Sequence, residues 1–513
     1  MGRVGPNWLV GLSICRLGLW KLAIQHAKLR KLWACSLVSN QRESTGDGVE
    51  DSPASVIDIV TSLLTSAASV VKTTDEKRWI DQLAERLVGV PTIGLAGRVS
   101  SGKSTLVNAL VGAQVAPTDA GECTRVATLY ECGAPECFDV IGFGGQRLRL
   151  PELAPAQLGM PLDDIDFAVA YTPQSRLRDR YRVIDTPGLS SHEITSERAT
   201  RRALVDHGGL PQPEVTLFLV EGGHVRQDEA EFMRAMGASR VNTILVISRA
   251  DIAGDGVMGE EDPFDVATRH AQRLLHERRD LASAAIPVAG LMAESAEVGI
   301  SEHEAATLAR LDGVDEFDLM ADIDGGSADP TLMNLYTKIG LYGVVHGRLA
   351  ASGGAIRLSD WLIERSGLQA LHRAIDDRFR LTGPVLKART ALDALQHQAW
   401  RSSARAEILT LIEEAELDPR LHCLREVVAL DRLVQSAPTS PLLDELERLL
   451  HSDNTESRVG VAAGSGADEI RDAAIQRISS CRTMKLTTFS GVEREALTVL
   501  ERSYQLAMGE VAR

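Results

Sequence analysis

A glycine-rich stretch near residue 100 constrains the fold more than any other part of the chain. Residues 97–104 read Gly-Arg-Val-Ser-Ser-Gly-Lys-Ser and fit G-x-x-x-x-G-K-[ST], the pattern of a phosphate-binding loop. The apolar run 92–96 predicts a buried strand before the loop, and an apolar stripe after it predicts a helix. This order places backbone N–H groups and a helix N-terminus around an anion. The stretch therefore predicts a nucleoside triphosphate site.

Two side chains of this loop have specific expected roles. Lys103 reaches the β- and γ-phosphates, and the hydroxyl of Ser104 is a ligand of Mg²⁺. The expected nucleotide contacts in this region are Gly97, Ser100, Ser101, Gly102, Lys103, Ser104 and Thr105.

A second motif follows the apolar run 181–184 and reads Asp185-Thr186-Pro187-Gly188. Open α/β sheets present ligand groups at the carboxyl ends of their strands. We therefore expect Asp185 to hold Mg²⁺ through a water molecule and the backbone N–H of Gly188 to contact the γ-phosphate.

A third motif, Ser248-Arg249-Ala250-Asp251, follows the predicted strand 243–247. The carboxylate of Asp251 can accept hydrogen bonds from N1–H and the exocyclic amine of guanine, a pattern that adenine does not offer. The methylene stem of Arg249 covers the base in this interpretation, and Ser248 keeps a hydroxyl nearby. We expect the loop after the last predicted strand, 286–290, to close over the base.

The segment between the first two motifs must supply a switch hydroxyl that reaches Mg²⁺ and the γ-phosphate. Thr124 is the best placed residue, and Thr118 and Thr128 are the alternatives. A strand is predicted over 126–130, and a hairpin over 138–143 and 148–150. Strands at 215–220 and 243–247 complete a mostly parallel sheet with flanking helices.

Charge and cysteine content narrow the possible partners. The 513 residues carry a formal net charge of −16, which argues against a surface built for nucleic acid. Seven scattered cysteines indicate a reducing compartment. Residues 1–42 differ, with seven Lys or Arg and no Asp or Glu. Two interpretations of this segment stay open: a basic amphipathic anchor at a membrane interface, and an over-extended start absent from the mature protein.

Helical periodicity dominates the rest of the chain. Apolar stripes at 56–64 and 80–87 precede the phosphate loop, and a series of stripes from 362 to 506 follows the predicted sheet. Four parts are expected: a basic extension (1–54), N-terminal helices that pack on the C-terminal bundle (55–89), an α/β P-loop GTPase domain (90–330), and an all-α antiparallel bundle (331–513). The last stripe, 497–506, is expected to meet the N-terminal helices.

The combination of the loop, the Asp-Thr-Pro-Gly motif, a Pro-Thr-Asp-Ala-Gly-Glu-Cys-Thr switch and Ser-Arg-Ala-Asp resembles bacterial dynamin-like GTPases. The likeness is greatest to the actinobacterial isoniazid-inducible dynamin-like proteins and spans about residues 55–510. It implies GTP hydrolysis with Mg²⁺, with Ser100, Lys103 and Thr124 as catalytic residues. It also implies a homodimer through the GTPase domain or a heteromer with a paralogue, and peripheral association with lipid at the inner face of the cell membrane.

Two departures from that family pattern matter for activity. Val99 stands where many dynamins carry glutamine, and valine cannot orient the attacking water by a hydrogen bond. The bundle also lacks a strongly apolar hairpin, and residues 438–443 are the nearest candidate. Two other functions remain: an Era-like regulatory GTPase that binds RNA or the ribosome, and a nucleotide-dependent heteromeric scaffold.

We predict that Asp251→Asn transfers preference from GTP to xanthosine triphosphate, whose C2 carbonyl can accept from the new amide. Loss of the charge-assisted pair costs on the order of 2–4 kcal/mol, or roughly 30- to 1,000-fold in GTP affinity. Competition titrations with GTP, ATP and xanthosine triphosphate measure the shift. If ATP competes equally with GTP in the unaltered protein, the guanine assignment fails.

Overall fold

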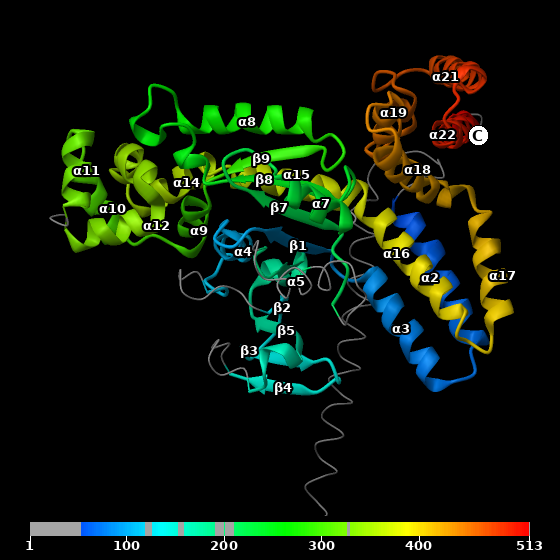
Figure 1. The fold of residues 1–513 in the computed structure, drawn as a ribbon, viewed down its shortest axis with the longest axis horizontal. Helices are drawn as coiled ribbons and strands as arrows, with labels where there is room; N and C mark the ends of the chain where they lie inside the picture. The colour runs from blue at the N-terminus through cyan, green and yellow to red at the C-terminus, as the bar shows by residue number, and fades with distance from the viewer. Residues whose placement is uncertain are drawn as a thin grey trace, which may run out of the picture. The chain divides into compact units, whose positions relative to one another are not determined.

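The computed structural model describes residues 53–117, 126–151, 159–189, 200, 210–236, 238–325 and 329–511. A nine-stranded sheet is its central element, with the strand order β4-β3-β5-β2-β6-β1-β7-β8-β9 (Figure 1). The strands are β1 (Thr92–Gly97), β2 (Thr128–Cys132), β3 (Cys137–Gly142), β4 (Arg147–Leu150), β5 (Ile165–Thr172), β6 (Arg182–Asp185), β7 (Val215–Val220), β8 (Thr243–Ser248) and β9 (Ala284–Val288). The expected basic extension over residues 1–54 lies outside the described residues except for its last two, which begin a helix.

Five neighbouring strands, from β6 through β1, β7 and β8 to β9, run parallel. Every residue of β1, β7 and β8 is buried, which explains their nearly continuous apolar sequences. One face packs against residues of α4 (Lys103–Val111), α9 (Gly290–Val298) and α15 (Leu368–Leu381). The other face packs against α7 (Gln227–Ala235) and α8 (Pro263–Glu277). The predicted mostly parallel sheet with flanking helices is confirmed.

The remaining strands extend the sheet by antiparallel pairs of β2 with β6, β3 with β5 and β3 with β4, while β2 and β5 pair in parallel. The hairpin of β3 and β4 was expected from the turn at Gly144 and Gly145, and it is present. Strand β5 was not expected; it pairs with both β3 and β2 and so attaches the hairpin to the sheet. Its alanine-rich centre lacks the β-branched run that marks a strand in sequence. The last strand, β9, begins and ends two residues before the predicted range of 286–290, and it ends early because Gly290 already starts α9.

Helices after the sheet continue to pack on the same domain. Residues of α12 (Pro330–His346) and α14 (Ala355–Arg365) share a core with residues of α9, and α15 lies on the sheet. The predicted boundary at residue 330 therefore divides elements that pack together. Shorter helices after the sheet are α10 (Glu302–Ala309), α11 (Glu316–Asp324) and α13 (Arg348–Ala351). Between the strands lie α5 (Ser175–Asp179) and 3₁₀ turns at Leu162–Asp164, Ala250–Ile252 and Gly256–Met258.

The other helices form two apolar clusters. The first joins α2 (Pro53–Val70) and α3 (Thr74–Val88) to α16 (Gly383–Ala399) and α17 (Arg405–Glu416), as Figure 1 shows. The second contains α18 (His422–Ser436), α19 (Leu442–Leu450), α21 (Ala467–Thr487) and α22 (Gly491–Val511). A 3₁₀ turn (Pro419–Leu421) precedes α18, and a short helix α20 (Thr455–Val459) precedes α21. None of the helices in the described part of the chain is long and apolar enough to cross a membrane.

The expected pairing of the last helix with the N-terminal helices is wrong. Leu497, Leu500 and Tyr504 of α22 are buried in the second cluster, against α18, α19 and α21. Chain connectivity explains the difference. Only three residues separate α3 from β1, and one separates α15 from α16, so α3 and α16 leave the sheet domain side by side.

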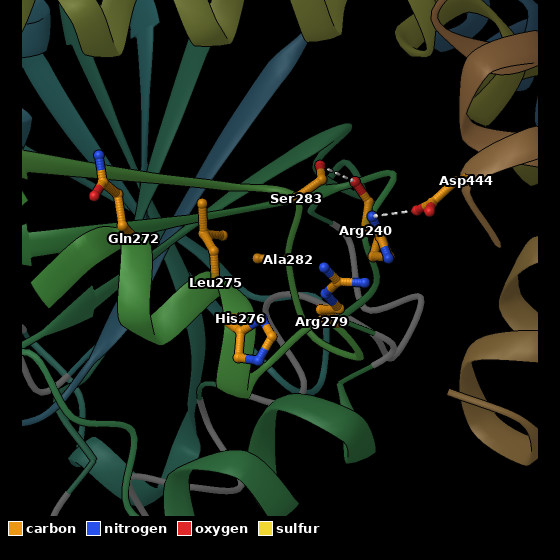
Figure 2. Close-up of a pocket in the computed structure, with 8 residues that line it drawn as sticks. All are labelled: Arg240, Gln272, Leu275, His276, Arg279, Ala282, Ser283 and Asp444. Carbon is orange, nitrogen blue, oxygen red and sulfur yellow. Dashed lines mark hydrogen bonds and ion pairs between the residues drawn. The ribbon is translucent and has the colours of Figure 1, made fainter. Parts of the chain in front are cut away.

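Besides the chain connections, a salt bridge links the sheet domain to the second helical cluster. Arg240, just before β8, forms an ion pair with Glu447 of α19, and both side chains are almost completely buried. Figure 2 shows Arg240 and Asp444 of α19 facing each other beside a cavity of about 350 Å³. Nη2 of Arg240 lies 3.8 Å from Oδ1 of Asp444. Ser283 donates to the carbonyl oxygen of Arg240 at 2.7 Å and so fixes this backbone.

We predict that Leu500→Ala lowers the free energy of unfolding by about 2–5 kcal/mol, because it leaves a cavity inside the second cluster. Leu417→Ala is the matched control, since that side chain is 80% exposed, and it should change stability little. Thermal or denaturant unfolding of the two variants gives the comparison. Equal effects would contradict the placement of α22.

Candidate nucleotide site

Glycines shape the phosphate-binding loop at the end of β1. Gly97 has φ 146°, and a Cβ there would lie 2.8 Å from the carbonyl oxygen of Leu219 on β7. Gly102 has φ 91° and directly precedes Lys103, the first residue of α4. The loop can therefore pass close to β7 and turn into the helix only with glycine at these two positions.

Two non-glycine residues have left-handed backbone conformations in the described ranges, and both belong to this site. Ser100 has φ 62° in the loop, and Arg249 has φ 56° after β8. A guanidinium nitrogen of Arg249 donates to the carbonyl oxygen of Ser100 at 2.9 Å, and another donates to Glu221 at 2.7 Å. Such conformations cost energy and persist where surrounding contacts enforce them. The phosphate loop and the third motif therefore hold each other in place.

Lys103 and Ser104 point into the loop and toward the second motif. The Nζ of Lys103 donates to the carbonyl oxygens of Gly97 at 3.1 Å and Arg98 at 2.8 Å. The hydroxyl of Ser104 donates to Oδ2 of Asp185 at 3.0 Å, and Asp185 is fully buried. A hydroxyl and a carboxylate this close form the hard oxygen set that Mg²⁺ prefers, so these residues fit the metal.

The Asp-Thr-Pro-Gly motif is bound tightly to the phosphate loop. The N–H of Val99 donates to the carbonyl oxygen of Leu189 at 3.2 Å, and the N–H of Leu189 donates to that of Gly97 at 3.0 Å. A Cβ on Gly188 would lie 2.6 Å from the Cα of Val99. Thr186 fixes the other side by donating to the carbonyl oxygen of Leu95 at 2.6 Å. Gly188 therefore lies against the loop, with Val99 as its neighbour.

Asp251 lies at the other end of the site, in a 3₁₀ turn after β8. Its side chain is nearly buried, and this burial raises the pKa of its carboxyl group above the ordinary value. The hydroxyl of Ser248 donates a hydrogen bond to the carbonyl oxygen of Val220 at 3.2 Å and not to the carboxylate of Asp251. This hydrogen bond joins the end of β8 to β7, and Ser248 also lines a cavity at this site.

One cavity of about 680 Å³ connects the phosphate loop to Asp251, a volume within the range of small-ligand sites. It is lined from three motifs by Val99, Ser100, Ser101, Gly102, Lys103, Ser104, Thr105, Leu106, Gly188, Ser248, Arg249, Asp251 and Ile252, among others. Of the predicted switch residues, Thr124 and Thr118 lie outside the described residues. Thr128 is buried in β2, where its hydroxyl donates to the carbonyl oxygen of Val126, and it does not line the cavity.

The sequence interpretation missed the helix that closes this cavity. Tyr336, Thr337, Gly340 and Leu341 of α12 line it, together with Gly290 and Leu291 at the start of α9. Helix α12 is kinked at Gly340, which has φ 68° and ψ 173°. A Cβ at this position would lie 3.0 Å from Oδ2 of Asp251. A glycine within a helical pattern was the one available signal.

Comparison with known proteins agrees with these motifs. The profile of the dynamin family matches residues 93–136. The chain is 30% identical over 421 residues to isoniazid-induced protein IniC of Mycobacterium tuberculosis, and the match covers 75% of this chain and 80% of IniC. A bacterial dynamin-like protein of Nostoc punctiforme is 28% identical over 125 residues, covering 21% of this chain and 18% of that protein.

The chain belongs to the bacterial dynamin-like GTPases. A solved structure of an oligomerised bacterial dynamin pair aligns with 93% of this dynamin-like protein and 78% of that chain, at 13% identity and a TM-score of 0.38. The family assignment rests on the sequence match to IniC and on the three motifs that meet in the 680 Å³ cavity.

We predict that Gly340→Ala weakens GTP binding by about 5- to 100-fold, because alanine disfavours this φ by about 1–3 kcal/mol, so that the α12 wall of the cavity shifts, and its methyl group contacts Asp251. ATP, which makes no pair with Asp251, should lose less affinity. Gly509→Ala in α22 is the control, since its Cβ would meet no atom within 4 Å. Unchanged GTP affinity in a folded Gly340→Ala protein would show that α12 does not shape the base pocket.

Proposed function

We propose that this dynamin-like protein binds and hydrolyses GTP and couples hydrolysis to self-assembly and membrane remodelling. The observation that carries the proposal is a single cavity with Ser104 at one end, hydrogen-bonded to the buried Asp185, and Asp251 at the other. This arrangement suits a nucleotide whose phosphates lie in the loop and whose base lies against α12.

The residues of the chain would act by positioning and by charge. Lys103 would bind the β- and γ-phosphates, and the N–H of Gly188 would contact the γ-phosphate. Ser104 would hold Mg²⁺ directly and Asp185 through water; the bound ion would neutralise charge on the phosphate oxygens. Ser100 and Thr124 would complete the catalytic set. Because Val99 cannot orient a water molecule by hydrogen bonding, we expect slow basal turnover.

An apolar rim around the cavity supports pairing of two GTPase domains. Ile252, Leu291 and Tyr336 line the cavity, yet their side chains are 53%, 41% and 37% exposed. Exposed apolar side chains beside a ligand site are typical of an interface. We propose that a second copy of this chain, or a dynamin-like paralogue, covers the rim when nucleotide is bound.

A different part of the molecule supports contact with lipid. Leu486 and Phe489, at the turn between α21 and α22, are 87% and 98% exposed. The segment 438–443, the candidate from sequence, is wrong for this role, because Leu442 and Leu443 are buried against α18 and neighbouring helices. We propose that the Leu486–Phe489 turn inserts into the bilayer interface at the inner face of the cell membrane.

GTP turnover of the full-length protein with and without anionic liposomes tests the proposal. We expect hydrolysis to increase on liposomes, and Leu486→Ser with Phe489→Ser to remove that increase and liposome sedimentation without changing basal turnover. Phe317→Ser is the matched control, because Phe317 is 72% exposed but lies on α11.

The possible outcomes separate the candidate functions. GTP binding without turnover under any condition would favour a nucleotide-dependent scaffold. Stimulation that persists in the Leu486→Ser, Phe489→Ser protein would show that lipid contacts another surface.

A further inference from the structure

A second large cavity lies where the helical half joins the sheet domain. It has a volume of about 580 Å³ and opens between α3, α16 and the amino ends of β6 and β7. Trp79 and Trp400 contribute to its walls, and the nucleotide site lies at the opposite, carboxyl end of the same strands. No residue of the proposed GTPase mechanism lines this cavity.

The cavity is rich in positive charge, although the chain as a whole is acidic. Arg86 of α3, Arg182 of β6, Lys387 of α16 and Arg401 line it, against one carboxylate, Glu214. Glu131 of β2 also pairs with Arg182 at 3.1 Å, so the described residues at this cavity supply four cations and two carboxylates. Within the described residues, positive charge therefore exceeds negative charge at this cavity.

The carboxylate of Glu214 already accepts a hydrogen bond from the backbone of the chain. Its Oε2 accepts a hydrogen bond from the N–H of Thr92, the first residue of β1, at 2.6 Å. Burial raises the pKa of this carboxyl group, although the charge of Lys387 opposes the shift. Glu214 thus holds the start of β1 in addition to facing the cations.

Of the four cations, Lys387 and Arg182 are partly shielded from solvent, whereas Arg86 and Arg401 are more exposed. Burial lowers the pKa of Lys387, and burial together with the nearby charge of Arg182 lowers the pKa of Arg86. The Nε of Arg182 is buried and has no hydrogen-bond partner in the described part of the chain. Such groups gain most from a bound anion, since desolvation strengthens each charge-assisted hydrogen bond.

We propose that this cavity binds a small anion that carries more than one phosphate group. Guanidinium groups match phosphate oxygens in a two-point geometry, and three of the four cations are arginines. The tryptophans offer apolar surface to an organic part of the ligand. The phosphates can belong to a soluble compound or to a lipid headgroup, and the experiment below distinguishes the two.

The ligand would contact the segment that connects the helices to the phosphate loop. The ammonium group of Lys387 donates to the carbonyl oxygen of Gly89. The backbone N–H of Arg182 donates to the carbonyl oxygen of Pro91 at 2.8 Å. Lys387 and Arg182 therefore flank the link between α3 and β1. Strand β1 then runs six residues from Thr92 to Gly97 at the loop. An anion bound here would fix α3 and α16 against the strand that ends at the nucleotide.

Calorimetric titration of the full-length, GDP-saturated protein with inorganic tripolyphosphate tests the proposal. We expect saturable binding that weakens about 10- to 100-fold in Arg86→Gln with Arg401→Gln, as two charge-assisted contacts are lost. Arg78→Gln is the matched control on α3, because Arg78 does not line the cavity and its side chain is 65% exposed. This control should bind as the unaltered protein does.

Sedimentation with phosphatidylcholine vesicles, with and without cardiolipin, whose headgroup carries two phosphates, identifies the source of the phosphate. Binding to the acidic vesicles that needs Arg86 and Arg401 and is displaced by tripolyphosphate indicates a headgroup; binding of tripolyphosphate without such sedimentation indicates a soluble ligand. Absence of both, or tripolyphosphate binding that the double substitution leaves unchanged, overturns the proposal. GTP affinity, measured separately in each variant, reports on the proposed GTPase function and not on this cavity.

Discussion

The parallel pairing of β1 with β6 and β7 is the constraint on which the nucleotide site depends. Because the carboxyl ends of these strands meet at one edge, the phosphate loop after β1 lies beside Asp185 at the end of β6. The Ser104–Asp185 hydrogen bond is the direct result of that pairing. Arg249, after β8, then reaches back to the carbonyl oxygen of Ser100 and links the third motif to the first. The order of the strands thus brings residues of three short motifs to the lining of one cavity.

The first helical cluster is connected to the sheet domain at the opposite edge, where the strands β1, β6 and β7 begin. Helix α3 enters β1 there, and α16 leaves α15 nearby, so the first helical cluster is attached at two points of the chain. The buried ion pair of Arg240 and Glu447 adds a separate link to the second cluster. Removing one partner of such a pair leaves an uncompensated charge in a largely buried position, so this contact opposes separation of α19 from the segment before β8.

These two edges suggest how a change at the nucleotide reaches the helices. Strand β1 joins the phosphate loop to Thr92, where Glu214 and the link to α3 are held. Gly188 and Leu189 are bound to the same loop through Val99 and Gly97. A shift of the second motif on binding or loss of the γ-phosphate would therefore act on a strand whose other end lies at the 580 Å³ cavity.

The sequence by itself determined the phosphate loop, the Asp185 motif, the four central strands and the family, because each depends on local residue order and spacing. It did not determine β5, because the alternation of apolar and polar residues that marks a strand is weak where side chains on both faces of the strand are buried. Gly340 could not be assigned either, since its role depends on Asp251, 89 positions away in the chain. Only the tertiary structure decided that α2 and α3 pack on α16 and α17 and not on α22. All these helices carry similar apolar stripes, and chain connectivity, which forces α3 and α16 out of the sheet domain together, selects between partners of equal hydrophobicity.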